Sequence, residues 1–206
     1  MTNENVGKEK EYGISRRQLL GSAVAAGAFT IIPSYVMGES VSGKKPPSEK
    51  LNIAAIGVGG MGANNTRRCA DAGENIIALC DVDHNLPGTV RVFNEYPDAE
   101  KYKDFRKMLE EMKNIDAVIV ATPDHTHTVA AMAAMQMGKH VYVQKPLTRT
   151  VYEARKLTET ARKYKVATQM GNQGHSGEGI RLMCEWIWNG AIGPVREVHA
   201  WTNRPV

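Results

Sequence analysis

The feature that most constrains the fold is the stretch of residues 51–62, LNIAAIGVGGMG. A short apolar run leads into a G-x-G-x-x-G spacing, and helix-forming residues follow. In such a strand, turn and helix, one glycine permits the turn, one lets the backbone approach a pyrophosphate, and one lets the helix lie close to the strand. Unpaired N–H groups of the helix then face the phosphates. The candidate cofactor-binding residues of this turn are Gly57, Gly59, Gly60, Met61 and Gly62.

The next predicted strand, residues 75–81, ends in an acidic residue. Asp81 follows the last glycine of the turn by about 20 residues, the position at which a carboxylate binds the ribose diol of NAD. A carboxylate there would also repel the 2′-phosphate of NADP. We therefore expect NAD as the cofactor, with Asp83 as a weaker candidate for the same task.

Short apolar strands alternate with helical segments along the rest of the chain. This order is typical of a parallel sheet that is covered by helices on both faces. The sequence predicts an α/β, Rossmann-type doubly wound NAD-binding domain over residues 51–173. Its expected helices span residues 63–72, 87–96, 104–113 and 150–164, and an Ala/Met-rich helix is expected from the turn at 122–127 to residue 137. Its later strands span 116–120, 140–143 and 165–170.

The strand at residues 116–120 ends in a polar turn. Ligands of such sheets bind at the carboxyl ends of the strands, so this turn should face the cofactor. Its candidate cofactor-binding residues are Thr122, Pro123, Asp124 and His127. The two histidines, His125 and His127, could instead cap the following helix or be solvated. No metal site is indicated, because the His-x-His pair lacks a third ligand of suitable spacing.

Lys145 is the candidate catalytic residue. It follows the strand at residues 140–143 and precedes Pro146, which restricts its backbone. A lysine at this edge would point into the cleft, although a surface lysine that closes a turn is the alternative. We expect Gln144 and Lys145, together with Asn172 after the next strand, to hold the nicotinamide half of the cofactor.

The remaining residues, 174–206, read as a helix over 178–189 and a strand over 195–201. We expect them to be the connecting helix and first strand of a truncated second domain of α+β type with an antiparallel sheet.

The first 38 residues predict a signal rather than part of the fold. Arg16 and Arg17 precede two leucines and a moderately apolar run of about 14 residues, shorter than the roughly 20 that a membrane span needs. The paired arginines resemble a twin-arginine export signal, whose partner would be the twin-arginine export machinery. A disordered basic arm is the alternative. We expect a periplasmic or otherwise exported protein without a stable membrane span, and a linker at residues 39–50.

Composition excludes several other classes. The formal net charge of +4 comes with no basic patch with interleaved aromatic residues, so we expect no nucleic-acid partner. The three cysteines, Cys69, Cys80 and Cys184, have no C-x-x-C spacing and are odd in number. Buried thiols are therefore expected rather than a disulfide framework or a zinc site.

Together these motifs resemble the Gfo/Idh/MocA family, which includes glucose-fructose oxidoreductase and inositol dehydrogenase. The resemblance rests on the glycine turn, Asp81, the Thr122-Pro123-x-x-x-His127 turn and Lys145-Pro146. It implies a Rossmann domain followed by an open-faced antiparallel sheet that carries the rest of a carbohydrate site, including a catalytic histidine, and homo-oligomers formed through that sheet. The leader and the GNQGHS and WTNRP segments look like an exported, carbohydrate-directed branch.

The departure from the family pattern is Gln144, where glutamate is usual. A carboxylate would favour a charged Lys145, so an amide makes a neutral amine easier to reach. The expected function is NAD-dependent hydride transfer with a secondary alcohol of a sugar or glycoside, with tightly bound cofactor. Two alternatives are an NAD-dependent glycosidase that oxidises the sugar transiently, and a non-catalytic sugar-binding protein with structural NAD.

Overall fold

The structure is a computed structural model that describes residues 49–201. The predicted leader, its Arg16-Arg17 pair, residues 39–48 of the linker and residues 202–206 lie outside the described residues. Six parallel strands form one sheet in the order β3-β2-β1-β4-β5-β6. Their bounds are β1 Asn52–Ile56, β2 Asn75–Cys80, β3 Glu100–Tyr102, β4 Ala117–Val120, β5 His140–Gln144 and β6 Thr168–Gly171. This order confirms the predicted Rossmann-type doubly wound fold.

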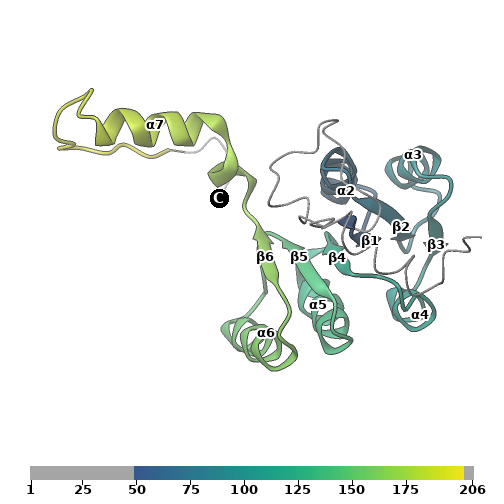
Figure 1. Ribbon diagram of the computed structural model, residues 1–206. Helices are drawn as coiled ribbons and strands as arrows, with labels where there is room; N and C mark the ends of the chain where they lie inside the picture. Colours follow the sequence, from purple (N-terminus) through teal and green to yellow (C-terminus); the bar gives the residue numbers. More distant parts are fainter. Residues whose placement is uncertain (1–48, 202–206) are drawn as a thin grey trace, which may run out of the picture. The chain divides into compact units, whose positions relative to one another are not determined.

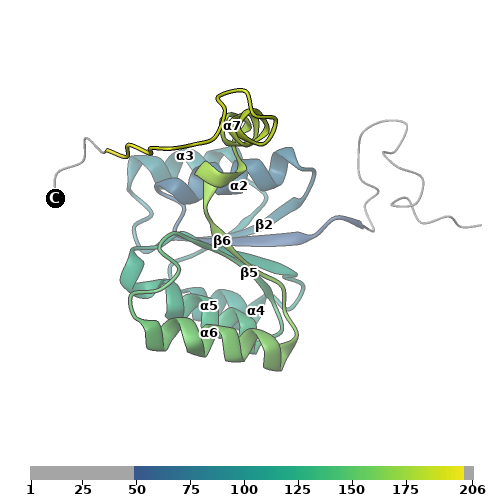
Figure 2. The ribbon, with the colours of Figure 1, turned by 90° about the vertical axis from the view of Figure 1, so that its left-hand side faces the viewer.

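Helices cover the sheet on both faces (Figures 1 and 2). Two of them, α2 (Met61–Asp71) and α3 (Pro87–Glu95), lie on one face. The other face carries α4 (Phe105–Glu111), α5 (His127–Gln136) and α6 (Val151–Tyr164). In the sheet, β1 lies between β2 and β4. The chain runs outward from β1 through β2 to β3 and then crosses back to β4, so the strand order reverses between β1 and β4. Such a switch point is where doubly wound folds bind dinucleotides.

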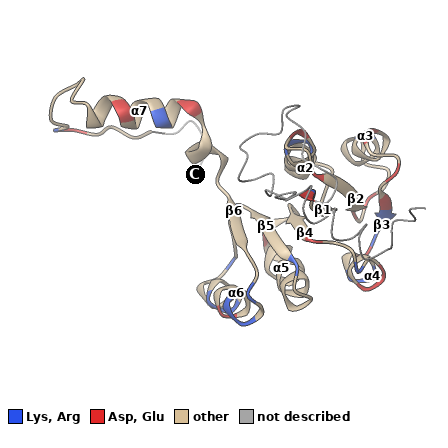
Figure 3. Ribbon diagram, in the orientation of Figure 1, with Lys and Arg blue, Asp and Glu red and all other residues tan. Residues whose placement is uncertain are grey.

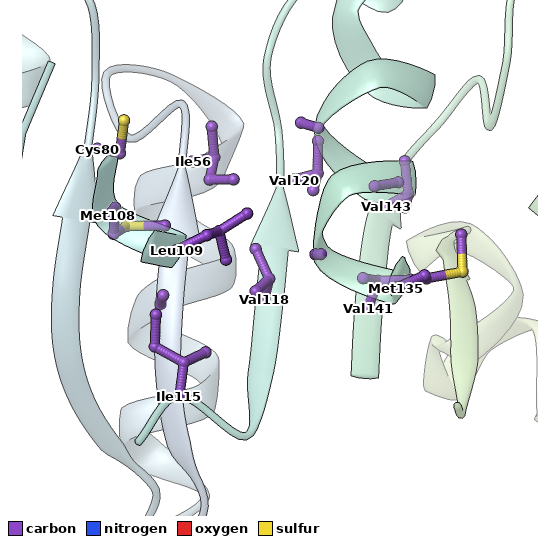
Figure 4. Packing of buried hydrophobic residues seen from close by; sticks show 14 of the residues in the cluster. Ile56, Cys80, Met108, Leu109, Ile115, Val118, Val120, Met135, Val141 and Val143 are labelled. Atoms are coloured by element: carbon purple, nitrogen blue, oxygen red, sulfur yellow. The ribbon is translucent and has the colours of Figure 1, made fainter. Parts of the chain in front are cut away.

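The larger core lies between the sheet and the second helix layer. Met108 and Leu109 of α4 and Met135 of α5 lie against Val118 of β4 and Val141 of β5 (Figure 4). The sequence of α5 contains no Lys, Arg, Asp or Glu, and Ala130, Ala131 and Ala134 are buried. Charged residues gather instead on α4 and α6 (Figure 3). The uncharged α5 is therefore the inner helix of this layer, and it begins at the carboxyl edge of the sheet.

Local sequence signals explain where several helices begin. The predicted capping box is present at α6, where the Thr150 hydroxyl accepts from the Glu153 N–H and the Glu153 carboxylate accepts from the Thr150 N–H. Asp104 is the N-cap of α4 and accepts from the N–H of Arg106. Pro87 occupies the first position of α3, where its missing N–H costs nothing.

Three elements differ from the expectation. Strand β3, Glu100–Tyr102, was not predicted, because three residues of the sequence EKY contain no apolar run. Strand β6 begins at Thr168 and not at residue 165, because Lys165 adopts a left-handed conformation (φ 54°) that ends α6. The predicted strand at residues 195–201 is wrong, since these residues have no strand structure. A segment with alternating apolar and polar residues forms a strand only where a neighbouring strand pairs with it. The described residues contain no such neighbour for residues 195–201.

Two short 3-10 helices and one longer helix complete the described chain. The 3-10 helices η2 (Asp124–Thr126) and η3 (Gln173–Ser176) follow the carboxyl ends of β4 and β6. Helix α7 (Glu178–Trp188) matches the predicted helix, and none of its residues is buried. Within residues 49–201, no helix has the length and apolar character that crossing a bilayer requires.

Candidate active site

The glycine turn has the close backbone approaches that its spacing predicts. Gly57 has a φ of +81°, which disfavours any residue with a side chain, and a Cβ there would lie 2.7 Å from the carbonyl oxygen of Ala121. A Cβ on Gly62 would overlap the carbonyl oxygen of Gly57. The turn therefore brings the start of α2 against the ends of β1 and β4. The surroundings of Gly60 differ, because a Cβ there would meet nothing within 4 Å.

Helix α3 supports the turn from the side, a contact that the motif did not reveal. A Cβ on Gly59 would lie 2.6 Å from Leu86 Cδ2 and 2.9 Å from Thr89 Oγ1. A Cβ on Gly88 would overlap the carbonyl oxygen of Gly59. The sequence signal that could have indicated this contact is a glycine in the first turn of a helix, directly after Pro87.

Asp81 follows β2 and holds the turn by hydrogen bonds. Its Oδ2 accepts from the N–H groups of Val58 at 2.9 Å and Gly59 at 3.1 Å, and its Oδ1 accepts from the N–H of Asp83 at 3.2 Å. Each carboxylate oxygen can accept more than one hydrogen bond, so hydroxyl groups of a ribose can still be bound. The carboxylate thus lies against the glycine turn, and its contact with a ribose stays a prediction.

A cleft of about 590 Å³ opens beside the turn. The predicted cofactor residues that line it are Gly57, Gly59, Gly60, Asp81, Thr122 and Pro123. The buried hydroxyl of Thr122 has no hydrogen-bond partner among the described residues. Three features of the cleft fit the adenosine and pyrophosphate part of NAD. They are the glycine backbone, which a Cβ would obstruct, the carboxylate of Asp81 and the unpartnered hydroxyl of Thr122. When bound, NAD would supply the hydride-transfer chemistry.

Seven predicted cofactor contacts do not line this cleft, namely Met61, Gly62, Asp124, His127, Gln144, Lys145 and Asn172. Met61 opens α2 and is 49% exposed. Asp124 is exposed in η2. His127 is completely buried, and its two ring nitrogens contact the backbone carbonyl oxygens of Thr122 and Pro146. His127 therefore lies beneath the wall of the cleft and not in it.

Gln144, which is itself buried, belongs to a cluster of amides at the end of β5. Its Oε1 accepts from Asn65 Nδ2 at 3.1 Å and from Gln173 Nε2 at 2.8 Å. Gln173 Nε2 also lies 3.3 Å from the Tyr142 hydroxyl. A Cβ on Gly171 would come within 2.8 Å of both Gln144 Oε1 and the Tyr142 hydroxyl, so the glycine leaves room for the cluster. Sequence reasoning missed Asn65 and Gln173, because their partners are remote in the chain.

Lys145 follows Gln144 directly and is exposed at the carboxyl edge of the sheet. The strand beside β5 is β4, whose following residues Thr122 and Pro123 wall the cleft. The lysine and the cofactor cleft therefore occupy adjacent strand ends.

Asn172 lines a second cleft, of about 600 Å³, on the side of α2. Asn64, Asn65, Arg68, Gln173 and Ser176 also line it, so it is rich in hydrogen-bonding groups. Such groups can recognise hydroxyls of a polar ligand. The structure thus separates Asn172 from the residues of the first cleft.

Two nearby groups stay protonated under ordinary conditions. Burial, aided by the negative charges of Asp81 and Asp104, raises the pKa of the Cys80 thiol to about 12. Burial also raises the pKa of Tyr142, which remains a neutral phenol in the amide cluster. Cys80 therefore has little thiolate with which to act as a nucleophile. Within the described residues, no group of three His, Cys, Asp or Glu could hold a metal ion.

Comparison with known proteins matches the part of the chain that contains the sheet and the glycine-turn cleft. Residues 51–172 match the model of the oxidoreductase family with an NAD-binding Rossmann fold (GFO_IDH_MocA). The chain is 30% identical over 153 residues to an inositol 2-dehydrogenase from Azotobacter vinelandii, covering 72% of this chain and 44% of the relative. It is 36% identical over 124 residues to an alpha-N-acetylgalactosaminidase from Bacteroides fragilis, covering 57% of this chain and 29% of the relative.

A solved structure shows the same fold. The myo-inositol 2-dehydrogenase of Lactobacillus plantarum superposes with a TM-score of 0.64 at 25% identity, covering 70% of this chain and 43% of the other. The chain spans less than half the length of the relatives that it matches. The family match covers residues 51–172 of this chain, the NAD-binding Rossmann part.

Proposed function

Because the chain belongs to the oxidoreductase family with an NAD-binding Rossmann fold, we propose that the protein exchanges a hydride between NAD and a secondary alcohol of a sugar or glycoside. The observation that carries this proposal is the position of Lys145, exposed at the end of β5 beside the strand end that walls the NAD cleft. The similarity to an inositol 2-dehydrogenase supports a polyhydroxylated substrate.

In this function Lys145 donates a hydrogen bond to the reacting oxygen and helps to move its proton, a task of a general acid or base. Gln144 fixes the backbone just before the lysine, because its amide is bound on one side by Asn65 of α2 and on the other by Gln173 of η3. The second cleft, rich in amides, lies next to this cluster and supplies hydrogen bonds for the substrate hydroxyls.

The test uses the full-length protein with a panel of inositols, aldoses and aryl glycosides. A secondary alcohol deuterated at its reacting carbon should transfer deuterium to the bound NAD. Mass spectrometry of the recovered cofactor measures the transfer. If no member of the panel transfers deuterium to the cofactor or loses its aglycone, the proposal is wrong, and a sugar-binding protein with structural NAD is favoured.

A second candidate function is glycoside cleavage through transient oxidation of the sugar. The similarity to an alpha-N-acetylgalactosaminidase favours it. The reaction would oxidise the sugar, eliminate the aglycone and return the hydride, so no net NADH would accumulate. Release of the aryl alcohol without net reduction of NAD identifies this outcome, whereas an oxidised sugar with an intact glycosidic bond identifies the dehydrogenase.

We further propose that the cofactor stays bound through export. If Arg16 and Arg17 send the folded protein to the periplasm by the twin-arginine machinery, free NAD is scarce where it works. The cofactor would then be loaded before export and regenerated in place, and the protein would form homo-oligomers through a C-terminal sheet domain. Denaturing protein purified without added cofactor should release nearly stoichiometric NAD, and empty protein would exclude retention.

A further inference from the structure

Gln144 makes all four hydrogen bonds that a side-chain amide can make. Its oxygen accepts from Asn65 Nδ2 at 3.1 Å and from Gln173 Nε2 at 2.8 Å. Its nitrogen donates to Gln173 Oε1 at 3.3 Å and to the carbonyl oxygen of Gly171 at 3.5 Å. An amide has two donor hydrogens and two acceptor lone pairs, so the side chain of Gln144 has no hydrogen-bonding capacity left for a ligand.

The side-chain amides of Asn65, Gln144 and Gln173 close into a ring. Asn65 donates to Gln144, Gln144 donates to Gln173, and Gln173 donates to Asn65 Oδ1 at 3.4 Å. Each member therefore both donates and accepts, which neither a carboxylate nor an apolar side chain of the same size can do. The carbonyl group of Gly171 fixes the direction of the ring, because it can only accept, and a rotated Gln144 amide would face it with an oxygen.

The amide ring connects three segments of the candidate site that are remote in the sequence. Asn65 belongs to α2, which begins in the glycine turn, and Gln144 is the last residue of β5, directly before Lys145. Gln173 begins η3 and follows Asn172, which lines the second cleft. The three pairs of ring members are 79, 29 and 108 positions apart. The ring thus links the cofactor turn, the candidate catalytic strand end and the second cleft.

We propose that Asn65, Gln144 and Gln173 act as one positioning unit, which fixes Lys145 relative to the glycine turn. Lys145 is exposed, and within residues 49–201 no hydrogen bond or ion pair holds its ammonium group. Its placement therefore depends on its backbone, which the ring restrains at the preceding residue. The three amides act through Lys145 and are not catalytic residues. This positioning role rests on the proposed function of Lys145, whereas the ring itself does not.

The test uses Gln173→Met and Asn65→Leu in the full-length protein, singly and together. Both substitutions nearly keep the size of the side chain and remove its donors and acceptors. The matched control is Gln136→Met, because Gln136 is exposed at the end of α5 and makes no side-chain hydrogen bond within the described part of the chain. Turnover, KM for the sugar, NAD affinity and melting temperature are measured for each variant.

We expect each single variant to lower kcat about tenfold, less than the hundredfold that a displacement of about 1 Å can cost. The KM for the sugar and the NAD affinity should stay unchanged, because the amides of the ring are occupied by one another. Since both substitutions break the same ring, the double variant should lose little more than the more defective single variant. The control variant should keep the kcat of the unmodified protein.

Two results would overturn the positioning role. A raised KM with unchanged kcat would show that these side chains bind the substrate instead, and kcat losses that multiply in the double variant would show that they act separately. The melting temperatures test the ring without any turnover, because a shared ring predicts that the double variant loses less than the sum of the single losses. Additive losses would exclude the ring. If the unmodified protein has no turnover, the proposed function and the positioning role are wrong, and the melting temperatures still decide whether the ring exists.

Discussion

Gly88 lies directly against Gly59, so that a single methyl group on Gly88 would overlap the Gly59 carbonyl oxygen. The second glycine of the cofactor motif is therefore held in place by a helix that the motif does not include. This contact makes the N-terminal turn of α3 part of the cofactor site.

We predict that Gly88→Ala weakens NAD binding about tenfold or more. The added methyl must push α3 or the glycine turn aside, and overpacking of this kind costs about 1–3 kcal/mol. Isothermal titration calorimetry measures the effect. Gly179→Ala is the control, because a Cβ at this position in α7 meets nothing within 4 Å. Equal NAD affinity of the two variants would exclude the support from α3.

Asp81→Asn should lower NAD affinity about tenfold and reduce the preference for NAD over NADP. The carboxylate accepts from Val58 and Gly59 through one oxygen and from Asp83 through the other. An asparagine has one acceptor oxygen, so its NH₂ group would face an N–H donor, and a charge-assisted bond worth about 1.5–3 kcal/mol would be lost. Competition titrations with both cofactors decide this, and an undiminished preference for NAD would contradict it.

Thr150→Ala should destabilise the protein by about 1 kcal/mol, because it removes the N-cap of α6. The expected decrease of the melting temperature is about 2–4 °C. Thr158→Ala, which removes another hydroxyl from the same helix without changing a cap, is the comparison. Equal melting temperatures of the two variants would show that the cap contributes nothing.

The capping box also predicts a pH dependence. The hydrogen bond from the Arg149 N–H, and then that from the Thr150 N–H, lower the pKa of Glu153 below its usual value. A carboxylate with a lowered pKa in the folded state stabilises the protein above its unfolded pKa, and this contribution disappears as the pH falls through the folded pKa. Glu153→Gln should therefore lower the melting temperature at neutral pH but not in strong acid. An equal difference at both pH values would contradict the assignment.

Cys80 should react slowly with thiol reagents. Its pKa of about 12, compared with 9.0 for an unperturbed thiol, reduces its thiolate fraction about a thousandfold. Peptide mapping after labelling with a disulfide reagent should find Cys184 modified well before Cys80. Labelling of both at the same rate would show that the thiol is accessible and ionised.

The fold could be predicted from sequence because its main signals are local. The glycine turn, the acid after β2 and the capping box at α6 each lie within a short segment. The apolar residues of the main strands likewise indicate, without reference to other segments, that these strands are buried. Strand β3 carries no such signal, since its position depends on pairing with Ala78–Cys80 of β2. Residues 195–201 have the alternating pattern of a strand but form none, because the pattern alone does not provide a strand to pair with.

The arrangement of the candidate site could be predicted only in part, because several of its contacts are not local in the sequence. Contacts between α3 and the glycine turn, and between Asn65 and Gln144, join residues that are remote in sequence, the latter pair 79 positions apart. The spacing predicted His127 as a cofactor contact, but its burial places it beneath the cleft, where its ring nitrogens lie against two backbone carbonyl oxygens. Pattern therefore indicates which residues matter, and packing determines what each one contacts.

The central claim is that NAD occupies the glycine-turn cleft and that Lys145 acts on the substrate oxygen. Lys145→Met in the full-length protein tests it most directly, because the methionine keeps the length of the side chain and removes its amine. We predict that NAD binding, measured by calorimetry, is unchanged, and that hydride transfer falls by at least about a hundredfold. Retained hydride transfer would contradict the role of Lys145, and loss of NAD binding would show that the lysine holds the cofactor instead.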